Sequence, residues 1–359
     1  MARRPMFLLV AGAVAAGAVV VSTGVLSGAP DGNTPPIAAD SSSAPQTTAD
    51  GTGASPATRI DARSFLLAAA DTALRETTTS GHYWYVRQRT THPTFAWPER
   101  FWTGVRKLQR QEQAEVDRTG AEDDELVAIN EKYNKKLERL RKSFYPDGPP
   151  YKAYIVESEE RWRPKRTGGT HRARSEDRKV VFPSPQDEAE WKEQGSPKLL
   201  EDKPKNVDDN LPRPLSISNM DITMQNVGTL PRSKKALAGH LRAQFAKLPD
   251  PHKEFDVYLW QTTVDLMTAP TTPGTRAAIF RILADQPDIT SNGEVEDAAG
   301  RKGVSLAVRS DDGHEFQLIV NRDTAELLEY AVAEKGEDTA RVTFEEFGWT
   351  DELGRRPQR

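Results

Sequence analysis

The amino-acid sequence predicts an α+β domain, in which an antiparallel, curved, half-barrel-like sheet is covered by helices and carries an inserted helical hairpin. Three observations lead to this fold class. Apolar and polar residues alternate near the C-terminal end of the 359-residue chain, and a charged stretch in its first half has helical periodicity. The N-terminal end is apolar and is followed by low-complexity sequence. The chain is therefore expected to be a folded domain on a membrane anchor.

The clearest strands lie near the C-terminal end. Apolar residues alternate with small or polar ones over 304–308 and 316–320, and strand-like sequence continues over 327–334 and 341–347. Short segments rich in Asp, Gly and Lys separate these strands. Four strands joined by tight turns form an antiparallel meander, which typically packs one face and leaves the other wet.

Further helices and strands are predicted upstream of this meander. Asp61 is a suitable N-cap for a first helix that continues to Leu74. The other predicted strands cover residues 82–90, 151–162 and 171–182. The other predicted helices cover residues 185–194, 233–247, 256–267 and 273–285. Residues 195–230 are rich in Pro, Asn, Asp and Lys, and they are expected to be a long irregular connection.

A densely charged stretch over residues 105–144 is predicted to form the inserted hairpin. Gly120 lies near its middle, and the second half places apolar residues at steps of three and four. These residues are Leu126, Ile129, Tyr133, Leu137, Leu140 and Phe144. Two interpretations remain open. The apolar seam packs on itself or on the domain, as helical stripes usually do, or the hairpin is a docking arm for another protein.

The N-terminal segment Met6–Leu26 contains 21 residues and no charge. As a helix it would span roughly 30 Å, the hydrocarbon thickness of a bilayer. Residues 1–28 are therefore predicted to be an uncleaved membrane anchor, with a cleaved signal peptide as the alternative. Arg3 and Arg4 favour the cytoplasmic side of the membrane, which places the bulk of the chain outside the cytoplasm.

The rest of the chain divides into three parts. Residues 29–60 contain almost no large apolar residue and are expected to be a disordered tether. Residues 61–350 are the predicted extracytoplasmic domain, with 105–145 as the helical insertion. Residues 351–359 are predicted to be a flexible tail.

Composition and motifs exclude several classes of protein. The chain has no cysteine, which excludes disulfides, thiol catalysis and a lipoprotein anchor. Its 49 Lys and Arg against 53 Asp and Glu argue against a nucleic-acid partner. The six histidines are not spaced as metal ligands, and the common catalytic and nucleotide-binding motifs do not occur in the sequence. We therefore predict no metal, no cofactor and no catalytic residue.

Aromatic residues gather around the first predicted strands. On the concave face of a half-barrel, Tyr83, Tyr85 and Trp162 would line a cavity for an apolar, lipid-like ligand. The alternative is that these side chains belong to the core, as most buried aromatic residues do.

Basic residues are densest over residues 161–179. There, Arg172, Arg174 and Arg178 would contact anionic lipid head groups or wall polymers. The alternative is an exposed hairpin that is partly neutralised by neighbouring acidic residues.

Several segments resemble a family of actinobacterial membrane proteins that is known by a locus-tag name. The similarity extends over about residues 63–350, apart from the helical insertion, and rests on residues 83–87, 183–191, 195–197, 276–284 and 297–304. The resemblance implies a single-pass protein arranged like the partners of extracytoplasmic-function sigma factors. Members have a longer segment before the membrane helix than the five residues found here. More loosely, the meander is similar to the half-barrel of bacterial lipoprotein carriers and envelope-stress sensors.

These observations together predict a membrane-tethered extracytoplasmic binding or sensory domain. It would act without catalysis, through an envelope protein partner or a lipid-like ligand. The alternatives are a cell-envelope enzyme with an unrecognised site and a structural component of the envelope.

Overall fold

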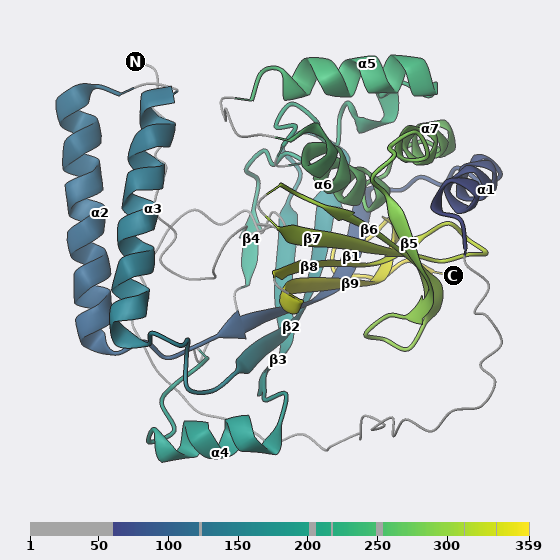
Figure 1. Ribbon diagram of the computed structural model, residues 1–359. Coiled ribbons are helices and arrows are strands. Elements are labelled where there is room, and N and C mark those ends of the chain that lie inside the picture. The colour runs from purple at the N-terminus through teal and green to yellow at the C-terminus, as the bar shows by residue number, and fades with distance from the viewer. Residues whose placement is uncertain are drawn as a thin grey trace.

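The computed structural model describes residues 60–121, 124–200, 206–216, 218–248, 254–311, 313–334 and 336–358. The predicted membrane anchor, Met6–Leu26, and nearly all of the predicted tether lie outside these residues. Within the described part of the chain, no helix combines the length and the apolar character that crossing a bilayer requires. The described residues form an α+β fold (Figure 1).

The elements follow one another along the chain as predicted, with a few additions. The helices are α1 (Ala62–Leu74), α2 (Glu99–Thr119), α3 (Asp124–Phe144), α4 (Pro185–Glu193), η1 (Val227–Thr229), α5 (Lys234–Phe245), α6 (Phe255–Met267) and α7 (Pro273–Leu283). The strands are β1 (Tyr83–Thr94), β2 (Ala153–Pro164), β3 (His171–Val181), β4 (Val207–Asp209), β5 (Thr290–Glu296), β6 (Lys302–Arg309), β7 (His314–Val320), β8 (Leu327–Glu334) and β9 (Glu337–Thr350).

All of these strands belong to one antiparallel sheet. Its order is β4-β3-β2-β1-β9-β8-β7-β6-β5, so the first and last β regions of the chain meet at the centre. The junction is the pairing of β1 with β9, in which Trp84 lies opposite Trp349. The sequence predicts two separate β regions, and the structure joins them into a single sheet.

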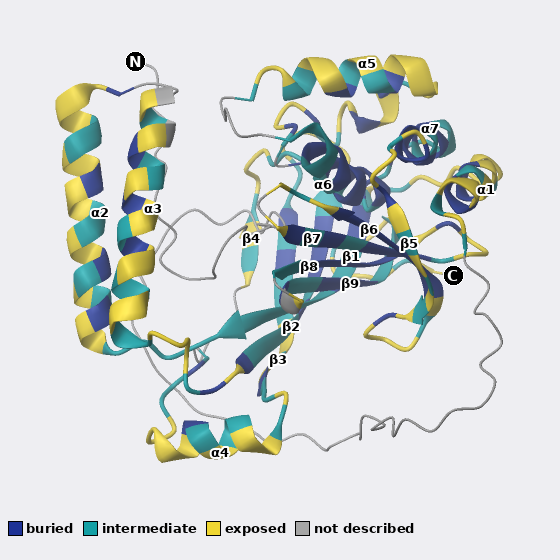
Figure 2. Cartoon of the chain, viewed as in Figure 1, coloured by how far each residue is buried: buried dark blue, intermediate teal, exposed yellow. Residues whose placement is uncertain are grey.

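The main hydrophobic core lies between the sheet and helices α1, α5, α6 and α7, which cover one face (Figure 1). The alternating apolar residues of the meander supply the sheet side of this core. Val304, Leu306 and Leu318 are at most 1% exposed, as is Tyr330 on β8. Figure 2 shows that the central strands are largely buried, whereas the helices expose their outer faces. Burial of one sheet face explains the alternating pattern of these strands.

Local sequence signals explain where the helices begin. Asp61 caps α1, because its carboxylate accepts a 2.7 Å hydrogen bond from the amide of Ser64. Ser184, Ser233 and Thr272 accept equivalent bonds at the starts of α4, α5 and α7. The cap at Asp61 was predicted, and the structure confirms it.

Helix α2 and strands β4, β5 and β9 differ from the prediction. Helix α2 begins at Glu99, six residues before the predicted start at residue 105, because Pro98 ends the preceding extended segment. Strands β4 and β5 were not predicted; β4 is only three residues long, and β5 is polar and largely exposed. Strand β9 is longer than predicted because it pairs with β8 at one end and with β1 at the other.

Candidate functional site

The aromatic residues predicted to line a ligand cavity lie on the outer face of the sheet. The indole of Trp84 donates a hydrogen bond to the carbonyl of Thr268 at the end of α6, so Trp84 faces the helices. Because side chains alternate along a strand, Tyr85 points to the opposite face. Trp162 lies directly across from Tyr85 on β2, and their ring centroids are 5.2 Å apart. Tyr83 is partly buried, two residues before Tyr85 on the same strand.

Residues 351–358 cover this aromatic pair. The indole nitrogen of Trp162 donates a 2.7 Å hydrogen bond to the carbonyl oxygen of Arg355, and the guanidinium of Arg356 reaches Glu160 at 2.8 Å. Tyr85 and Trp162 are consequently 0% and 3% exposed. The prediction of a flexible tail at residues 351–359 did not anticipate these contacts.

Glu160 is the polar centre of this outer face. Its carboxylate accepts hydrogen bonds from Tyr85 (2.6 Å), Arg87 (3.2 Å) and Arg356 (2.8 Å). Burial alone would raise the pKa of Glu160, but the hydrogen bond from Tyr85 and the charge of Arg356 together hold the pKa below its usual value. Burial, and then the bond to Glu160, raise the pKa of the Tyr85 hydroxyl. At neutral pH Glu160 is therefore a charged carboxylate, and the neighbouring Tyr85 is a protonated phenol.

The basic residues predicted to contact an anionic surface are already paired with carboxylates. Arg172 and Arg174 both pair with Asp208 of the neighbouring strand β4, each at 2.7 Å. The hydrogen bonds from the two arginines hold the pKa of Asp208 well below its usual range. Arg178 pairs with Glu157 of β2 at 3.3 Å. Since these side chains are partly exposed, they remain candidates for contact with anions, but in competition with these acidic partners.

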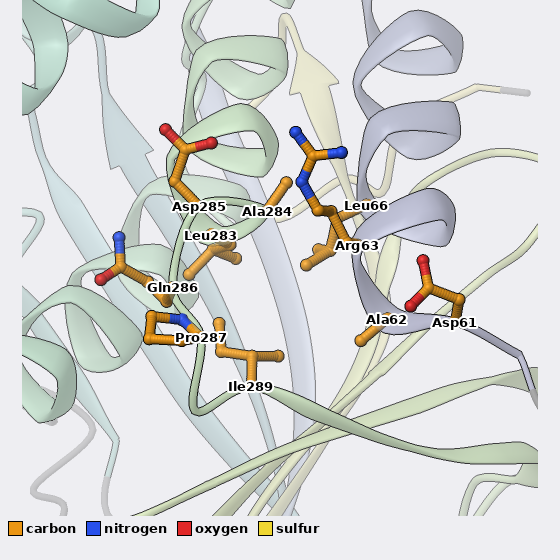
Figure 3. Close-up of a pocket in the computed structure, with 10 residues that line it drawn as sticks. All are labelled: Asp61, Ala62, Arg63, Leu66, Leu283, Ala284, Asp285, Gln286, Pro287 and Ile289. Atoms are coloured by element: carbon orange, nitrogen blue, oxygen red, sulfur yellow. The ribbon is translucent and has the colours of Figure 1, made fainter.

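One cavity lies beside the N-terminal end of α1. Its volume is about 360 Å³, and its walls come from α1 and from the connection between α7 and β5 (Figure 3). The lining residues are Asp61, Ala62, Arg63, Leu66, Leu283, Ala284, Asp285, Gln286, Pro287 and Ile289. Asp61 is used as the helix cap and Asp285 pairs with Lys234, so both carboxylates already have partners.

A smaller cavity of about 40 Å³ lies between α6 and strands β1 and β2. Gln88 lines it and is 3% exposed, and its side-chain nitrogen has no hydrogen-bond partner within the described residues. Arg163 also lines it and donates to the carbonyl of Pro214 at 3.0 Å. Burial, together with the nearby charge of Arg161, lowers the pKa of Arg163 to about 10. Neither cavity is lined by Tyr83, Tyr85 or Trp162.

The hairpin of α2 and α3 stands to one side of the sheet (Figure 1). The two helices pack mainly on each other and contain two hydrophobic clusters of their own, centred on Phe101 with Leu137 and on Ile129 with Tyr133. An aromatic group that includes Phe95, Trp97 and Tyr145 connects the hairpin to the ends of β1 and β2. The predicted apolar seam is confirmed as the contact between the two helices.

Sequence reasoning did not identify Glu160, Gln88 or Arg163 as notable residues. Glu160 lies in a strand that also contains Glu157 and Glu159, so the sequence gives no reason to distinguish it from an exposed acidic residue. Only the pairing of β1 with β2 places it beside Tyr85 and Arg87. The one available signal for Gln88 was that it lies in a strand that begins with three aromatic residues, Tyr83, Trp84 and Tyr85.

No protein-family model matches the sequence, and no curated protein matches it significantly. Among solved structures, MucB in complex with MucA(peri) is 12% identical, with a TM-score of 0.26 over 82% of this chain. The MucA/MucB complex of Pseudomonas aeruginosa is 14% identical, with a TM-score of 0.25 over 83% of this chain. An uncharacterized conserved protein from Thermus thermophilus is 23% identical over 20% of this chain, with a TM-score of 0.16.

The chain spans 58% of each of the two MucB structures and 47% of the Thermus protein. The likeness to MucB is therefore weak, and overlaps of this quality do not establish a common fold.

Proposed function

We propose that this protein is a membrane-tethered, extracytoplasmic protein-binding domain that docks its partner through the hairpin of α2 and α3, here called the arm. The observation that carries the proposal is the separation of the arm from the rest of the domain. Its two hydrophobic clusters are distinct from the main core, and its helices pack mainly on each other. The arm therefore contributes little to covering the sheet.

The arm also has a charged surface suited to a partner. The part nearest the sheet, residues 99–110 and 132–144, contains ten Lys and Arg against two Glu, a net charge of +8. On α3, Lys132, Lys135, Arg139 and Lys142 are exposed at helical spacing, next to the apolar seam. Such a basic stripe favours a partner with an acidic surface, because complementary charge increases the rate and specificity of association.

The location rests on the sequence. Met6–Leu26 would hold the domain at the cell membrane, and Arg3 and Arg4 would orient it so that the bulk of the chain lies outside the cytoplasm. The proposal assigns no catalytic activity to the domain.

A lipid-like ligand is less well supported than a protein partner. The space between the sheet and the covering helices contains the tightly buried main core, including Trp260, Phe280 and Tyr330. The predicted lining residues Tyr85 and Trp162 lie on the other face and are covered by residues 351–358. To bind, an acyl chain would have to displace either side chains of the main core or residues 351–358.

The test places a photo-crosslinking residue at Arg139 of α3 or, as a control, at Lys192 of α4, in cells of the natural host. We expect a crosslinked partner at position 139, and loss of that product when Lys135 and Lys136 are changed to Glu. The product at position 139 should persist when the control residue Lys192 is changed to Glu. A product that charge reversal on the arm does not remove, or no product at position 139, would contradict the proposal.

A deletion separates folding from docking. Residues 99–144 can be replaced by a short Gly-Ser turn, because Thr94 and Ala153 lie opposite each other at the base of the arm. The shortened protein should retain the unfolding temperature of the main domain and lose the partner. A domain that fails to fold without the arm would show that the arm is structural.

A further inference from the structure

Residues 351–358 cross the outer face of the sheet over a defined row of side chains. In the strand register, Tyr85 of β1 lies opposite Gly348 of β9 on one side and Trp162 of β2 on the other, and Trp162 lies opposite Arg172 of β3. The row Gly348-Tyr85-Trp162-Arg172 therefore runs across four neighbouring strands. We call this row, together with Glu160, the outer groove.

The segment follows this row from β3 back to β9. Gly354 lies against the guanidinium of Arg172, and the carbonyl oxygen of Arg355 accepts a hydrogen bond from Trp162. The side chain of Arg356 then reaches Glu160. Pro357 lies over Gly348, where an added Cβ would come within 3.1 Å of the proline ring. Glycine at position 348 thus leaves the space that the proline ring occupies.

These contacts are of the kind by which proteins recognise extended peptides. The segment forms no helix or strand, and Gly354, Arg355 and Arg356 are exposed on their outer side. It is held by one backbone carbonyl, one charge-assisted hydrogen bond and one proline ring. Under it, Tyr85, Trp162 and Glu160 are each at most 6% exposed.

The outer groove can lose the segment without leaving a buried charge unpaired. Glu160 would retain its hydrogen bonds from Tyr85 at 2.6 Å and from Arg87 at 3.2 Å. The indole nitrogen of Trp162 would become available to water. An unpaired buried charge is the main cost of removing one partner from an ion pair, and here that cost does not arise.

We propose that the outer groove is a binding site for an extended peptide that contains an arginine followed by a proline, and that residues 351–358 occupy it as an intramolecular ligand. Glu160 selects the arginine, and the space above Gly348 selects the proline. A partner protein with such a segment gains access when the intramolecular segment is displaced. This site is separate from the arm and does not depend on the function proposed for it.

Residues 351–358 are covalently attached to the domain, so they compete with any external peptide for the outer groove. An intramolecular ligand on a short link acts at an effective concentration on the order of millimolar. An external peptide with the same contacts must compete against that concentration. The full chain should therefore bind such a peptide much more weakly than a chain that ends at Thr350.

The experiment measures binding of a fluorescent peptide with the sequence of residues 351–358 to the full chain and to a chain that ends at Thr350. We expect the shortened chain to bind at least tenfold more tightly. In the peptide, Arg356→Gln should weaken binding at least tenfold, because it removes the contact with Glu160. The matched change Arg355→Gln should have little effect, because the groove contacts only the backbone carbonyl of Arg355, whose side chain pairs with Glu352 of the segment itself.

Two results would overturn the proposal. One is a folded shortened chain that does not bind the peptide, and the other is equal weakening by the two peptide substitutions. If the shortened chain does not fold, the full chain with Arg356→Gln replaces it. That variant should bind the unchanged peptide at least tenfold more tightly than the natural full chain, and equal binding would show that residues 351–358 are purely structural.

Discussion

The hydroxyl of Tyr85 donates a 2.6 Å hydrogen bond to the carboxylate of Glu160, although the two residues are not opposite each other in the strand register. Tyr85 is paired with Trp162, and Glu160 is paired with Arg87, so the bond runs diagonally between neighbouring pairs on the outer face of the sheet. Diagonal pairs of this kind are within reach of long and aromatic side chains. This bond links the aromatic row to the charged residues beside it.

Replacing Tyr85 with Phe tests the strength of this bond. The ring and its packing on Trp162 remain, while Glu160 loses one of three donors. Because hydrogen bonds to charged groups contribute about 1.5–3 kcal/mol, we expect the free energy of unfolding to fall by about 1–2 kcal/mol. Urea denaturation at pH 7 measures the change. Tyr83→Phe is the control and should change stability by less than about 0.5 kcal/mol. Equal effects of the two substitutions would show that the bond contributes nothing.

His171 should make the stability of the domain depend on pH. It is 6% exposed, and burial, together with the nearby charges of Arg163 and Arg213, lowers its pKa to about 4 from the usual 6.5. At pH values between about 4 and 6.5, His171 is therefore protonated in the unfolded chain and neutral in the folded chain. Stability is therefore complete above pH 6.5 and falls as the pH decreases towards 4.

Between pH 7 and pH 5 this residue should reduce the free energy of unfolding by roughly 1–2 kcal/mol. His171→Gln should remove that part of the pH dependence in urea denaturation. The exposed His82 is the matched control, and His82→Gln should leave the pH dependence of the natural chain intact. If His171→Gln retains the full pH dependence, the assignment to His171 is wrong.

Gln88 should lower the stability of the domain, because its buried amide nitrogen has no partner within the described residues. Gln88→Met removes the amide at nearly constant volume, so we expect the free energy of unfolding to rise by about 1 kcal/mol. Gln317 offers a matched control, since its amide nitrogen donates to the hydroxyl of Ser305 at 2.8 Å. Gln317→Met should lower stability by a similar amount. A loss of stability in Gln88→Met would mean that ordered water or a ligand satisfies the amide.

The elements that sequence reasoning located well depend on local patterns. The apolar seam of α3 and the alternation of β6 and β7 each repeat over a few residues, and both were found close to their true positions. The joining of β1 to β9 was not predicted, because it pairs residues at least 250 positions apart. Pairing at this distance depends on the whole fold rather than on local sequence.

The candidate site residues show the same limit. Tyr85 and Trp162 were predicted to line a ligand cavity, but the sequence could not show which face of the sheet they occupy. Asp208, which binds Arg172 and Arg174, lies in a stretch predicted to be irregular. Its role follows only from the short strand β4, which pairs with β3.

Glu112 should make the arm less stable as the pH rises. It is 7% exposed in α2, between Leu108 and Val116, which both pack in the seam. Burial raises its pKa to about 6 from the usual 4.5, so the folded arm binds the proton more tightly than the unfolded chain. The resulting stabilisation is complete below pH 4.5 and is lost as the pH rises through 6.

Glu112→Gln mimics the protonated residue and should stabilise the arm by about 1–2 kcal/mol at pH 7.5, with little effect at pH 4.5. Hydrogen exchange of the amides in α2 and α3 measures this local stability. The control is Glu138→Gln, because Glu138 is 51% exposed and its removal should change protection by less than about 0.5 kcal/mol. Equal protection of the Glu112→Gln arm and the natural arm at pH 7.5 would exclude a burial cost at this position. A gain that develops between pH 4.5 and pH 6 and is constant above pH 6 would show that protonation of Glu112 stabilises the natural arm.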